Sequence, residues 1–316
     1  MELERRAPRI SIGMPVYNAE QYIEGALDSL LGQTFEDFEL IISDNASTDR
    51  TEKICRSHAM KDERIRYIRN RANYGVIQNF NQVLRISSGE YFKWAASDDI
   101  CEHDYLRRAV EILDADPSVV LVWARTVGID EDGNHVDLPA EVSDLNSHDS
   151  VYSPDPVVRF RRLMRHMWWV DGPFYGVIRA DALENRLHPI HMSGDQILLT
   201  ELSLLGRFYE IPDVTFLSRV HARKSSRISS LRARALAVDP PLGERRSPGL
   251  WELVRGYPQR IAMYVSIIRR APINRNQKIR CYAEVARTLG WWIRLRASRI
   301  LSGSLADRIR PSYPPR

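Results

Sequence analysis

Two adjacent aspartates, Asp98 and Asp99, stand directly after a run of aromatic and small apolar residues that begins at Tyr91. The run follows a Ser-Gly turn and predicts a buried strand over residues 91–99. In an open α/β sheet, ligands bind beyond the carboxyl ends of the strands. Two carboxylates in that place suit a Mg²⁺ or Mn²⁺ ion that carries a diphosphate. The alternative is that they only cap the next helix, because aspartate is a favoured N-cap residue.

Two further polar segments follow predicted strands. The strand patterns at residues 9–14 and 38–42 lead into polar stretches at 15–18 and 44–49. The carboxyl ends of parallel strands lie at one edge of a sheet, so these stretches and the two aspartates should meet in a single crevice. One such loop is ordinary turn chemistry, because Asn, Asp and Ser are common in turns. Three in succession favour a binding site.

The chain has neither of the glycine-rich motifs that hold phosphates with backbone N–H groups, G-x-G-x-x-G and G-x-x-x-x-G-K-[ST]. The sequence therefore supports neither a dinucleotide-binding fold nor a P-loop. A diphosphate in the predicted crevice would instead need a metal ion to neutralise its charge. That requirement gives Asp98 and Asp99 a chemical role.

The order of the predicted elements supports such a crevice. Strands and helices alternate over the first hundred residues, and the helices carry apolar residues at helical spacing. Repeated strand–helix–strand units imply a parallel sheet that helices cover on both faces. Asn18 is expected to cap a first helix over residues 22–31. The other predicted elements are strands at 38–42, 65–68 and 91–99 and helices from Asp49 and over 77–84.

Four short segments together resemble one enzyme family. They are Ser11-Ile12-Gly13-Met14-Pro15-Val16-Tyr17-Asn18, Ile42-Ser43-Asp44-Asn45-Ala46-Ser47-Thr48-Asp49, Asn73-Tyr74-Gly75 and Ser97-Asp98-Asp99. In type, order and spacing they resemble the nucleotide-binding half of the family 2 glycosyltransferases, and the similarity covers about the first two-thirds of the chain. The resemblance implies an α/β GT-A fold, with a Rossmann-like, mostly parallel sheet. It also implies transfer of a sugar from a nucleotide-diphosphate donor, with a UDP-sugar favoured, to an acceptor hydroxyl with inversion.

The resemblance also assigns roles to individual residues. The implied nucleotide-binding residues are Pro15, Tyr17, Asn18, Asp44, Asn45, Asn73, Gly75 and Asp98. Of these, Pro15 and Tyr17 would flank the base, and Asp44 would bond the base or the ribose. Asp98 and Asp99 form a variant of the D-x-D motif, with Asp99 as the direct ligand of Mn²⁺ or Mg²⁺.

Residues 101–235 are predicted to form the acceptor half of the domain, with a helix over 105–113, a strand over 119–123 and a hairpin turn at Asp132-Gly133. The polar stretch 139–156 is long for a loop, which favours a mobile lid over disorder. Trp168 and Trp169 are adjacent, so a regular element cannot point both of them into one core. One of them is a candidate for the acceptor pocket, although a stripe of this kind also fits an ordinary core.

Asp195 stands at the start of an apolar segment, 197–205, that predicts a helix. A plain N-cap is one interpretation. In the resembled family, an acidic residue here is the general base, which takes the acceptor's proton as its oxygen attacks the anomeric carbon. The family's usual text at this point is Glu-Asp, so Gly194 is a departure that leaves the acid expected to work. We therefore favour Asp195 as the catalytic base.

His221 closes the second of two predicted strands, 207–211 and 214–220, which Pro212-Asp213 separates. Related enzymes place a histidine here near the metal and the diphosphate, so His221 is a candidate metal ligand, although a lone histidine is more often structural. An imidazole beside two carboxylates suits Mn²⁺ slightly better than Mg²⁺. Arg223 and Lys224 would neutralise phosphate oxygens from a closing loop, or they belong to a solvated basic strip.

The charge of the chain reverses along its length, although the whole sequence has a net charge of +4. Residues 251–316 hold 14 Arg or Lys and 3 Asp or Glu, a net of +11, and residues 1–250 hold 31 basic and 38 acidic side chains, a net of −7. Basic amphipathic helices with tryptophans are predicted over 251–269 and 274–301. Such helices bind membrane surfaces, or they pack on a protein core with their arginines outward. No recognised motif supports a nucleic-acid partner.

Length and composition allow a GT-A domain over residues 1–235, with its nucleotide-binding half at about 8–100, and a basic helical extension over 236–316. The apolar and charged fractions are typical of soluble globular proteins, and no apolar run is long enough for a transmembrane helix. The charged N-terminus does not resemble a signal peptide, and the three scattered cysteines indicate neither disulfides nor zinc. We expect a cytoplasmic protein whose membrane contact, if any, is peripheral at the inner face.

Two other functions compete with glycosyl transfer. A sugar nucleotidyltransferase shares the nucleotide-binding sheet and acidic metal ligands, but it would normally carry a glycine-rich basic loop, which residues 10–20 lack. A non-catalytic sugar-nucleotide-binding protein would have a decayed site, and Asp44, Asp98, Asp99 and Asp195 are all present. The sequence thus favours a metal-dependent glycosyltransferase that acts on a glycan or lipid-linked acceptor, as in cell-envelope polysaccharide synthesis.

Overall fold

The computed structural model describes residues 6–138, 151–165, 171–184, 186, 194–221 and 250–302, and in the last segment it describes the side chains of 259–290. The N-terminal half alternates strands and helices as predicted. Its elements are β1 (Ile10–Val16), α1 (Ile23–Leu31), β2 (Phe38–Asp44), α2 (Thr51–Ala59), β3 (Ile65–Arg69), α3 (Val76–Arg85) and β4 (Tyr91–Trp94). β1 lies between β2 and β4 and is parallel to both, with Ile10 opposite Phe38 and Tyr91.

The second half adds antiparallel strands to the same sheet. Its elements are β5 (Ile100–Cys101), α4 (Tyr105–Ala115), β6 (Val119–Ile129), β7 (His135–Val136), α6 (Pro156–Arg165), α7 (Asp171–Phe174), β8 (Val177–Arg179), α8 (Ala180–Leu183), α9 (Gly194–Leu202) and β9 (Arg207–Arg219). In the described part of the chain, nine strands form one sheet in the order β3-β2-β1-β4-β8-β6-β9-β5, with β7 paired to β6. β8 is antiparallel to both β4 and β6, and β6 is parallel to β9. The α/β class with a mostly parallel sheet is confirmed.

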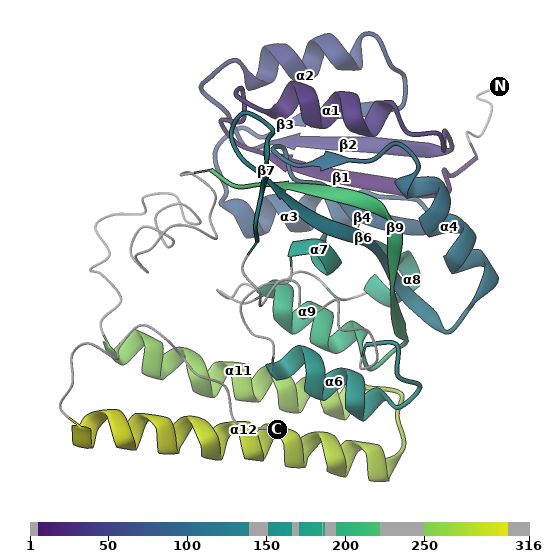
Figure 1. Cartoon of the computed structure of the whole chain (residues 1–316). Coiled ribbons are helices and arrows are strands. Elements are labelled where there is room, and N and C mark those ends of the chain that lie inside the picture. The colour runs from purple at the N-terminus through teal and green to yellow at the C-terminus, as the bar shows by residue number, and fades with distance from the viewer. Residues whose placement is uncertain are drawn as a thin grey trace.

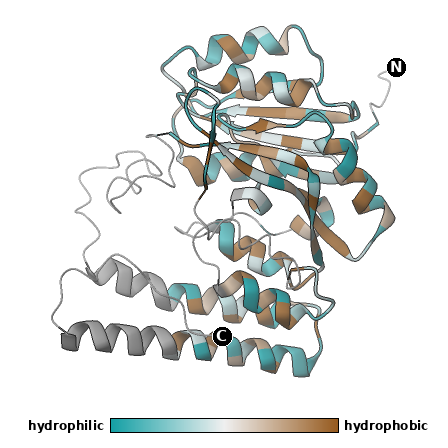
Figure 2. Ribbon diagram, viewed as in Figure 1, coloured by the Kyte–Doolittle hydropathy of each residue, from teal (hydrophilic) through white to brown (hydrophobic). Residues whose placement is uncertain are grey.

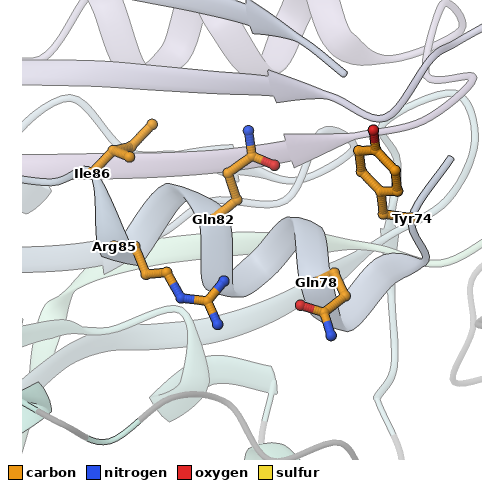
Figure 3. A pocket seen from close by; sticks show the side chains of 5 residues that line it. All are labelled: Tyr74, Gln78, Gln82, Arg85 and Ile86. Atoms are coloured by element: carbon orange, nitrogen blue, oxygen red, sulfur yellow. The ribbon is translucent and has the colours of Figure 1, made fainter. Parts of the chain in front are cut away.

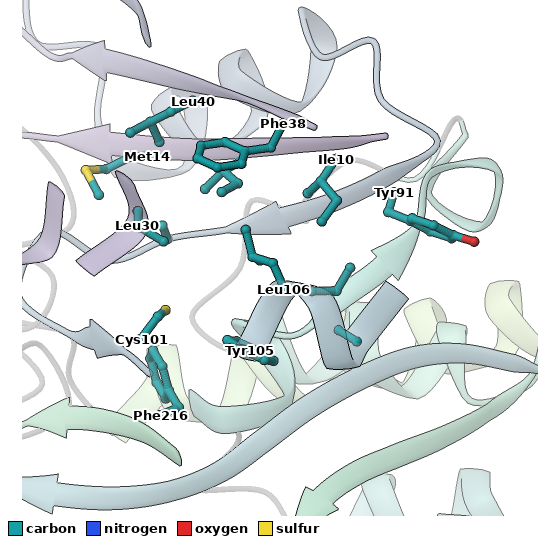
Figure 4. Packing of buried hydrophobic residues seen from close by; sticks show 14 of the residues in the cluster. Ile10, Met14, Leu30, Phe38, Leu40, Tyr91, Cys101, Tyr105, Leu106 and Phe216 are labelled. Atoms are coloured by element: carbon teal, nitrogen blue, oxygen red, sulfur yellow. The ribbon is translucent and has the colours of Figure 1, made fainter. Parts of the chain in front are cut away.

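Apolar side chains fill both faces of this sheet. On one face, Ile10 and Met14 of β1 pack with Leu30 of α1 and Leu106 of α4, and Figure 4 shows these side chains converging between the elements. On the other face, Trp94 packs in a cluster with residues of α3, α7, α8 and α9. Successive side chains of a strand point to opposite faces, so strands buried on both faces are apolar almost throughout. The sheet is therefore a rigid support for the polar loops at its edge.

The strand that leads to the two aspartates is shorter than predicted. β4 ends at Trp94, and the N–H of Ala95 makes a last contact with the carbonyl of Gly13 at 2.9 Å. The chain then leaves this position in the sheet, and Ile100 pairs with Leu217 of β9 instead. Asp98 and Asp99 consequently lie in a loop between β4 and β5, because the two short strands belong to different parts of the sheet.

Residues 207–219 form one strand, where the sequence predicted two. β9 continues through a bulge, since Ile211 lies opposite Ala124 and Thr215 lies opposite Arg125. Pro212 falls within the bulge, where its missing N–H costs no ladder hydrogen bond. Pairing with β9 also extends β6 to Ile129, beyond the predicted end at residue 123. The local sequence does not predict either extension, because the hydrogen bonds that extend each strand come from the other strand.

The C-terminal region forms two long helices, α11 (Leu250–Arg270) and α12 (Arg275–Ser302), which lie beside each other below the sheet in Figure 1. Ile268 and Cys281 from these helices share a third apolar cluster with Phe160 of α6 and Ile197 of α9. Over residues 259–290, Figure 2 shows hydrophilic and hydrophobic residues mixed in both helices, in contrast to the largely hydrophobic strands. The predicted helical extension is thus packed against α6 and α9. Among the described helices, none has the length and apolar character needed to cross a bilayer.

Candidate functional site

The two aspartates lie where the β4–β5 loop packs against the end of β9, and Asp98 contacts His221 there. His221 Nε2 is 2.8 Å from Asp98 Oδ2, and the backbone N–H of Arg219 donates to Asp99 Oδ1 over 2.8 Å. Asp99 is only 4% exposed, while Asp98 is more open. The segment after the pair is β5, and the next helix, α4, begins at Tyr105. The interpretation of the pair as a helix cap is therefore wrong.

This arrangement fits a divalent cation together with its substrate. In the described residues, no group of three or more His, Cys, Asp or Glu side chains is placed to hold a metal ion by itself. Nucleotide-bound Mg²⁺ is usually held by one or two carboxylates, with phosphate oxygens and water completing the shell. Asp98 and His221 offer one oxygen and one nitrogen donor, a combination that Mn²⁺ accepts. The residues present fit a cation whose other ligands come from a diphosphate.

Asp44, at the end of β2, is fully buried and has several hydrogen-bond donors around its carboxylate. Oδ1 accepts the N–H of Ser47 at 2.8 Å, and Oδ2 accepts the Tyr67 hydroxyl at 2.7 Å and Arg69 Nη1 at 2.6 Å. Burial by itself raises the pKa of Asp44, but the hydrogen bonds from Ser47, Tyr67 and Arg69 outweigh it and hold the pKa below its usual value. A bond from Asp44 to a base or ribose would have to compete with these partners.

The sequence reasoning missed Tyr67 and Arg69. Both lie on β3, which is parallel to β2, and Arg69 is the register partner of Asp44. Two residues apart on one strand, their side chains point to the same face of the sheet. Polar groups at the ends of side chains at alternate positions of this strand, next to the crevice, are the sequence signal that could have identified the two residues.

Amide side chains bring the predicted residues Asn45, Asn73 and Gly75 together. Asn45 Nδ2 donates to Asn73 Oδ1 at 2.7 Å and to the carbonyl of Gly75 at 3.3 Å, and Asn73 Oδ1 also accepts the N–H of Gly75 at 2.9 Å. Gly75 has a φ of 89°, which glycine adopts without the steric cost of a side chain. These contacts hold the loop that enters α3 against the end of β2.

Two buried asparagines that the sequence reasoning missed extend this network. Asn79 Nδ2 donates to the carbonyl of Ser43 at 2.8 Å, and Asn70 Nδ2 donates to the side-chain oxygens of both Asn45 and Asn79 at 3.2 Å. Asn79 stands one turn before Val83 on the buried face of α3. An amide on an otherwise apolar helix face is the signal that could have identified it, because buried polar groups need partners.

The loop after β1 carries the other predicted nucleotide-binding residues. Pro15 lies within β1 opposite Ser43, and Tyr17 follows the strand with half of its surface exposed. The prediction that Asn18 caps α1 is wrong, because that helix begins at Ile23. Instead, Asn18 Oδ1 accepts the N–H of Thr48 at 2.8 Å. Asn18 has a φ of 49°, a conformation that asparagine tolerates better than most residues. The structure thus ties the first crevice loop to the second and leaves the Tyr17 ring open to solvent.

Asp195, the predicted general base, is the second residue of α9. Its Oδ1 accepts the N–H of Gln196 at 2.8 Å, and Gln196 Nε2 donates to the carbonyl of Leu163 in α6 at 3.0 Å. The start of α9 is thereby fixed against α6. In Figure 1 this end of α9 lies on the same side of the molecule as the carboxyl ends of β1 and β2. Asp195 remains the predicted base, at a partly exposed position in the first turn of α9.

Several predicted residues lie outside the described residues, namely Trp168, Trp169, Arg223 and Lys224. Most of the predicted lid, 139–156, lies outside them as well. The last part of that stretch is described, and there the lid prediction is wrong. Val151 is buried, and its carbonyl accepts the N–H of Phe208 at 3.2 Å, so the chain is fixed to the start of β9.

A surface pocket of about 490 Å³ lies along α3, lined by Tyr74, Gln78, Gln82, Arg85 and Ile86 (Figure 3). None of these residues was predicted to belong to the site. Gly75, at the crevice, lies next to one end of the pocket, but the other lining residues follow α3 toward its last turn. The pocket therefore leads away from the carboxyl ends of the strands, and we do not assign it to the site.

Comparisons with known sequences point to one family. A family model described as Glycosyl transferase family 2 matches residues 11–184, more than half of the chain. A chondroitin synthase from Escherichia coli is 34% identical over 130 residues, which cover 41% of this chain and 19% of that protein. An uncharacterized glycosyltransferase from Haemophilus influenzae is 36% identical over 107 residues, 34% of this chain and 33% of that protein. The chain spans a third or less of the length of these two relatives.

Solved structures share the fold at low sequence identity. TarS 1–349 from S. aureus, in complex with UDP-GlcNAc, is 20% identical with a TM-score of 0.62, over 88% of this chain and 71% of that one. The mannosyltransferase PcManGT from Pyrobaculum calidifontis, in complex with GDP-Man and Mn²⁺, is 18% identical with a TM-score of 0.53, over 96% of this chain and 82% of that one. The likeness confirms the GT-A fold.

Proposed function

Because this chain belongs to glycosyl transferase family 2, we propose that it transfers a sugar from a nucleoside-diphosphate donor to an acceptor hydroxyl with inversion at the anomeric carbon. The observation that carries this proposal is that Asp98 contacts His221 and Asp99 contacts Arg219 where the β4–β5 loop lies against the end of β9. Since β4 is the parallel neighbour of β1, this point adjoins the edge where the loops after β1 and β2 lie. A donor can then span from the polar loops to the acidic pair.

Asp98, Asp99 and His221 would hold a Mn²⁺ or Mg²⁺ ion. When bound, such an ion neutralises the diphosphate and makes it a better leaving group. The neighbour PcManGT, whose structure contains GDP-Man and Mn²⁺, supports a metal–donor pair in a fold of this kind. The absence of a glycine-rich phosphate loop from the sequence supports it further, because the charge of the diphosphate needs another partner.

We propose a UDP-sugar as the donor, with a GDP-sugar as the alternative to test. The structural neighbour TarS carries UDP-GlcNAc, and PcManGT carries GDP-Man, so the fold accepts both bases. In this chain Pro15 and Tyr17 would flank the base, and the exposed ring of Tyr17 would stack on it. Asp44 would act through Arg69 and Tyr67, or directly if a ligand displaces one of them, since both now donate to its carboxylate.

Asp195 would take the proton from the acceptor hydroxyl as that oxygen attacks the anomeric carbon. The bond from that carbon to the diphosphate oxygen breaks, and its electron pair leaves with the nucleoside diphosphate. The new glycosidic bond forms on the opposite face of the sugar, which gives inversion. Asp195 lies in the first turn of α9, at the end of a helix where a negative charge is stabilised by the helix dipole.

We propose a glycan or lipid-linked acceptor, as in cell-envelope polysaccharide synthesis. One support is the relative named as a chondroitin synthase, which points to a polysaccharide. A second is the outer face of α12, where Ile279 is 55% exposed, Tyr282 is 36% exposed and Arg275 lies one turn before Ile279. Exposed apolar residues flanked by arginines fit peripheral binding to an anionic lipid surface.

The central experiment incubates the full chain with a panel of UDP- and GDP-sugars and Mn²⁺ and measures release of the nucleoside diphosphate. At least one donor should be hydrolysed faster than in buffer. In calorimetry, Asp99→Asn should weaken binding of the matching diphosphate with Mn²⁺ at least tenfold, about 1.4 kcal/mol. The control is Asp213→Asn, an exposed acid in the bulge of β9. A folded chain that binds and hydrolyses no donor would contradict the function, while unchanged affinity in Asp99→Asn would contradict only the metal site.

A further inference from the structure

Arg219, the last residue of β9, contacts both aspartates of the proposed metal site. Its backbone N–H donates to Asp99 Oδ1 at 2.8 Å, and its side-chain Nε donates to the carbonyl oxygen of Asp98 at 3.0 Å. One contact thus fixes the side chain of Asp99, and the other fixes the backbone of Asp98. β9, which carries Arg219, is paired with both β6 and β5 in the sheet.

The far end of the same guanidinium contacts two other parts of the crevice. Nη1 donates to the carbonyls of Asp130 at 2.8 Å and Glu131 at 3.1 Å, in the turn between β6 and β7. The guanidinium also lies over the ring of Tyr22, 4.7 Å from its centroid, next to the start of α1. The side chain of Arg219 therefore joins three segments that are distant in sequence: the β4–β5 loop, the β6–β7 turn and the residue before α1, Tyr22.

His221 extends this arrangement toward the proposed metal. Its Nε2 lies 2.8 Å from Asp98 Oδ2, and its ring lies 5.1 Å from the ring of Tyr22, in a tilted arrangement. Tyr22 is thus placed between Arg219 and His221. Arg219 and His221 therefore both contact Asp98: Arg219 contacts its backbone carbonyl, and His221 contacts its carboxylate.

The side-chain contacts require an arginine in particular, whereas the backbone contact with Asp99 does not. A planar guanidinium can aim Nε at one carbonyl while Nη1 meets two others and its face covers an aromatic ring. A lysine carries its charge on a single nitrogen and cannot reach these separated carbonyls at once. The Nε and Nη1 groups of Arg219 are used on protein carbonyls, so their effect on a ligand passes through the aspartates.

We propose that Arg219 is the positioning residue of this site, which holds the Asp98-Asp99 turn in its binding conformation before the nucleotide and the metal ion arrive. The proposal rests on the proposed function, since it takes the aspartates to bind the metal–diphosphate group. Without the side chain, the β4–β5 loop would lose its link to the β6–β7 turn. Ligand binding would then have to order the loop, and the apparent affinity would fall by the fraction of time that the loop is misplaced.

The first test needs no metal and no nucleotide. Hydrogen–deuterium exchange of the full chain, followed by mass spectrometry, is compared for wild type, Arg219→Met and Arg207→Met. Arg207 is the matched control, because it is the arginine at the opposite end of β9 and pairs with Asp116 away from the crevice. Arg219→Met should speed exchange in peptides that cover residues 95–101 about tenfold, and Arg207→Met should leave them unchanged. Equal exchange in wild type and Arg219→Met would overturn the proposal.

The second test separates positioning from other roles in the folded protein. Mn²⁺ is titrated into each variant with saturating UDP or GDP, whichever the wild type binds, and unfolding by urea gives the stability. Arg219→Met should raise the apparent Kd for Mn²⁺ at least tenfold, and Arg219→Lys should not restore it. Metal-free nucleotide binding should stay within twofold of wild type, because the side-chain hydrogen bonds of Arg219 go to protein carbonyls.

The remaining outcomes are distinct. Weaker metal-free nucleotide binding in Arg219→Met, with rescue by Arg219→Lys, would show a direct phosphate contact and overturn positioning, since a lysine also binds phosphate. Reduced stability with unchanged Mn²⁺ affinity would show a merely structural residue and overturn it too. If the wild type binds neither nucleotide with Mn²⁺, the proposed function itself fails, whatever the exchange experiment gives.

Discussion

The crevice at the carboxyl ends of the strands and the C-terminal helix pair α11–α12 are held by different forces. In the crevice, buried polar groups such as Asp44 and Asn45 are bonded to partners from other segments of the chain. In the helix pair, Ile267 and Ile268 pack with apolar residues of α6 and α9. Two charged residues of the helix pair are also buried, Arg260 on α11 and Glu284 on α12, and Glu284 pairs with Arg287 at 2.5 Å.

The crevice thus depends on directional hydrogen bonds, and the helix pair depends on non-directional apolar packing. A hydrogen bond to a buried carboxylate depends on distance and angle, so removal of one partner leaves a charge in a place that cannot solvate it. Apolar packing is non-directional, so its loss costs free energy roughly in proportion to the area and the cavity left behind. Substitutions in the crevice should therefore alter function or one defined contact, and those in the helix pair should alter stability.

The largest expected effect is in the crevice and tests whether function and stability are separable. Asp195→Asn should lower glycosyl transfer by about 10²–10⁴-fold, because the acceptor hydroxyl loses its general base. Donor binding and the urea midpoint should stay close to those of the wild type. The measurement is the initial rate with the donor that the panel identifies. Asp181→Asn, an exposed acid in the first turn of α8, is the control and should keep full activity.

A transfer rate within tenfold of wild type in folded Asp195→Asn would rule out this residue as the base. Asp195 would then be an ordinary acid in the first turn of a helix, and another carboxylate would have to be sought.

The second effect probes the helix pair. Ile268→Ala should lower the free energy of unfolding by about 2–5 kcal/mol, because the side chain is fully buried between α11 and its neighbours and its removal leaves a cavity. Ile279→Ala on the exposed face of α12 is the matched control and should change it by less than about 0.5 kcal/mol. Urea unfolding followed by tryptophan fluorescence measures both. Equal effects in the two variants would mean that the helix pair is not stabilised by this cluster.

The third effect concerns the buried carboxylate at the end of β2. Tyr67→Phe removes the hydroxyl that donates to Asp44 and should lower the free energy of unfolding by about 1.5–3 kcal/mol at pH 7, the usual range for a hydrogen bond to a charged group. Tyr282→Phe, at a partly exposed position on α12, is the control and should be neutral.

The pH dependence of this loss has a defined sign. The folded-state pKa of Asp44 is lowered, so the stability from its ionised form is complete above the ordinary value of about 3.9 and is lost as the pH falls through the lower folded-state value. The gap between wild type and Tyr67→Phe should therefore be constant from about pH 5 to pH 8 and shrink below about pH 4. A gap that grows on acidification would contradict this assignment. Urea unfolding over that range measures it.

The smallest effect concerns the outward face of the helix pair. The full chain should co-sediment with vesicles that contain anionic lipid, less strongly at high salt. Arg275→Ala should weaken this binding by about 1 kcal/mol, roughly fivefold, because one cation near an anionic surface contributes that much. Arg50→Ala is the control, since this exposed arginine precedes α2 on the sheet side of the molecule. Absence of vesicle binding at low salt would mean that the region serves for packing alone, which would favour a soluble acceptor.

Much of the fold from β1 to α3 could be predicted from local pattern. The strands and helices from β1 to α3 follow from apolar spacing and turn residues, and a parallel order follows from their alternation. The loops with Asp44, Asn45 and Asn73 could be placed at one edge, because parallel strands that alternate with helices have their carboxyl ends there. The individual side-chain contacts could not be predicted. For example, Asn18 accepts a hydrogen bond from Thr48, in the loop after β2, and does not cap α1.

The sequence by itself thus determined the elements of the first half, the family and the residue types of the site, because these depend on short-range pattern. Only the tertiary structure decided that β8 enters the sheet between β4 and β6, that β9 runs unbroken past Pro212, and that α11 and α12 cover α6 and α9. It also decided that Arg219 reaches Asp98 and Asp99 across about 120 residues of chain. Contacts between residues that are so far apart in sequence depend on how whole elements pack. The spacing of neighbouring residues in the sequence does not reveal which elements pack together.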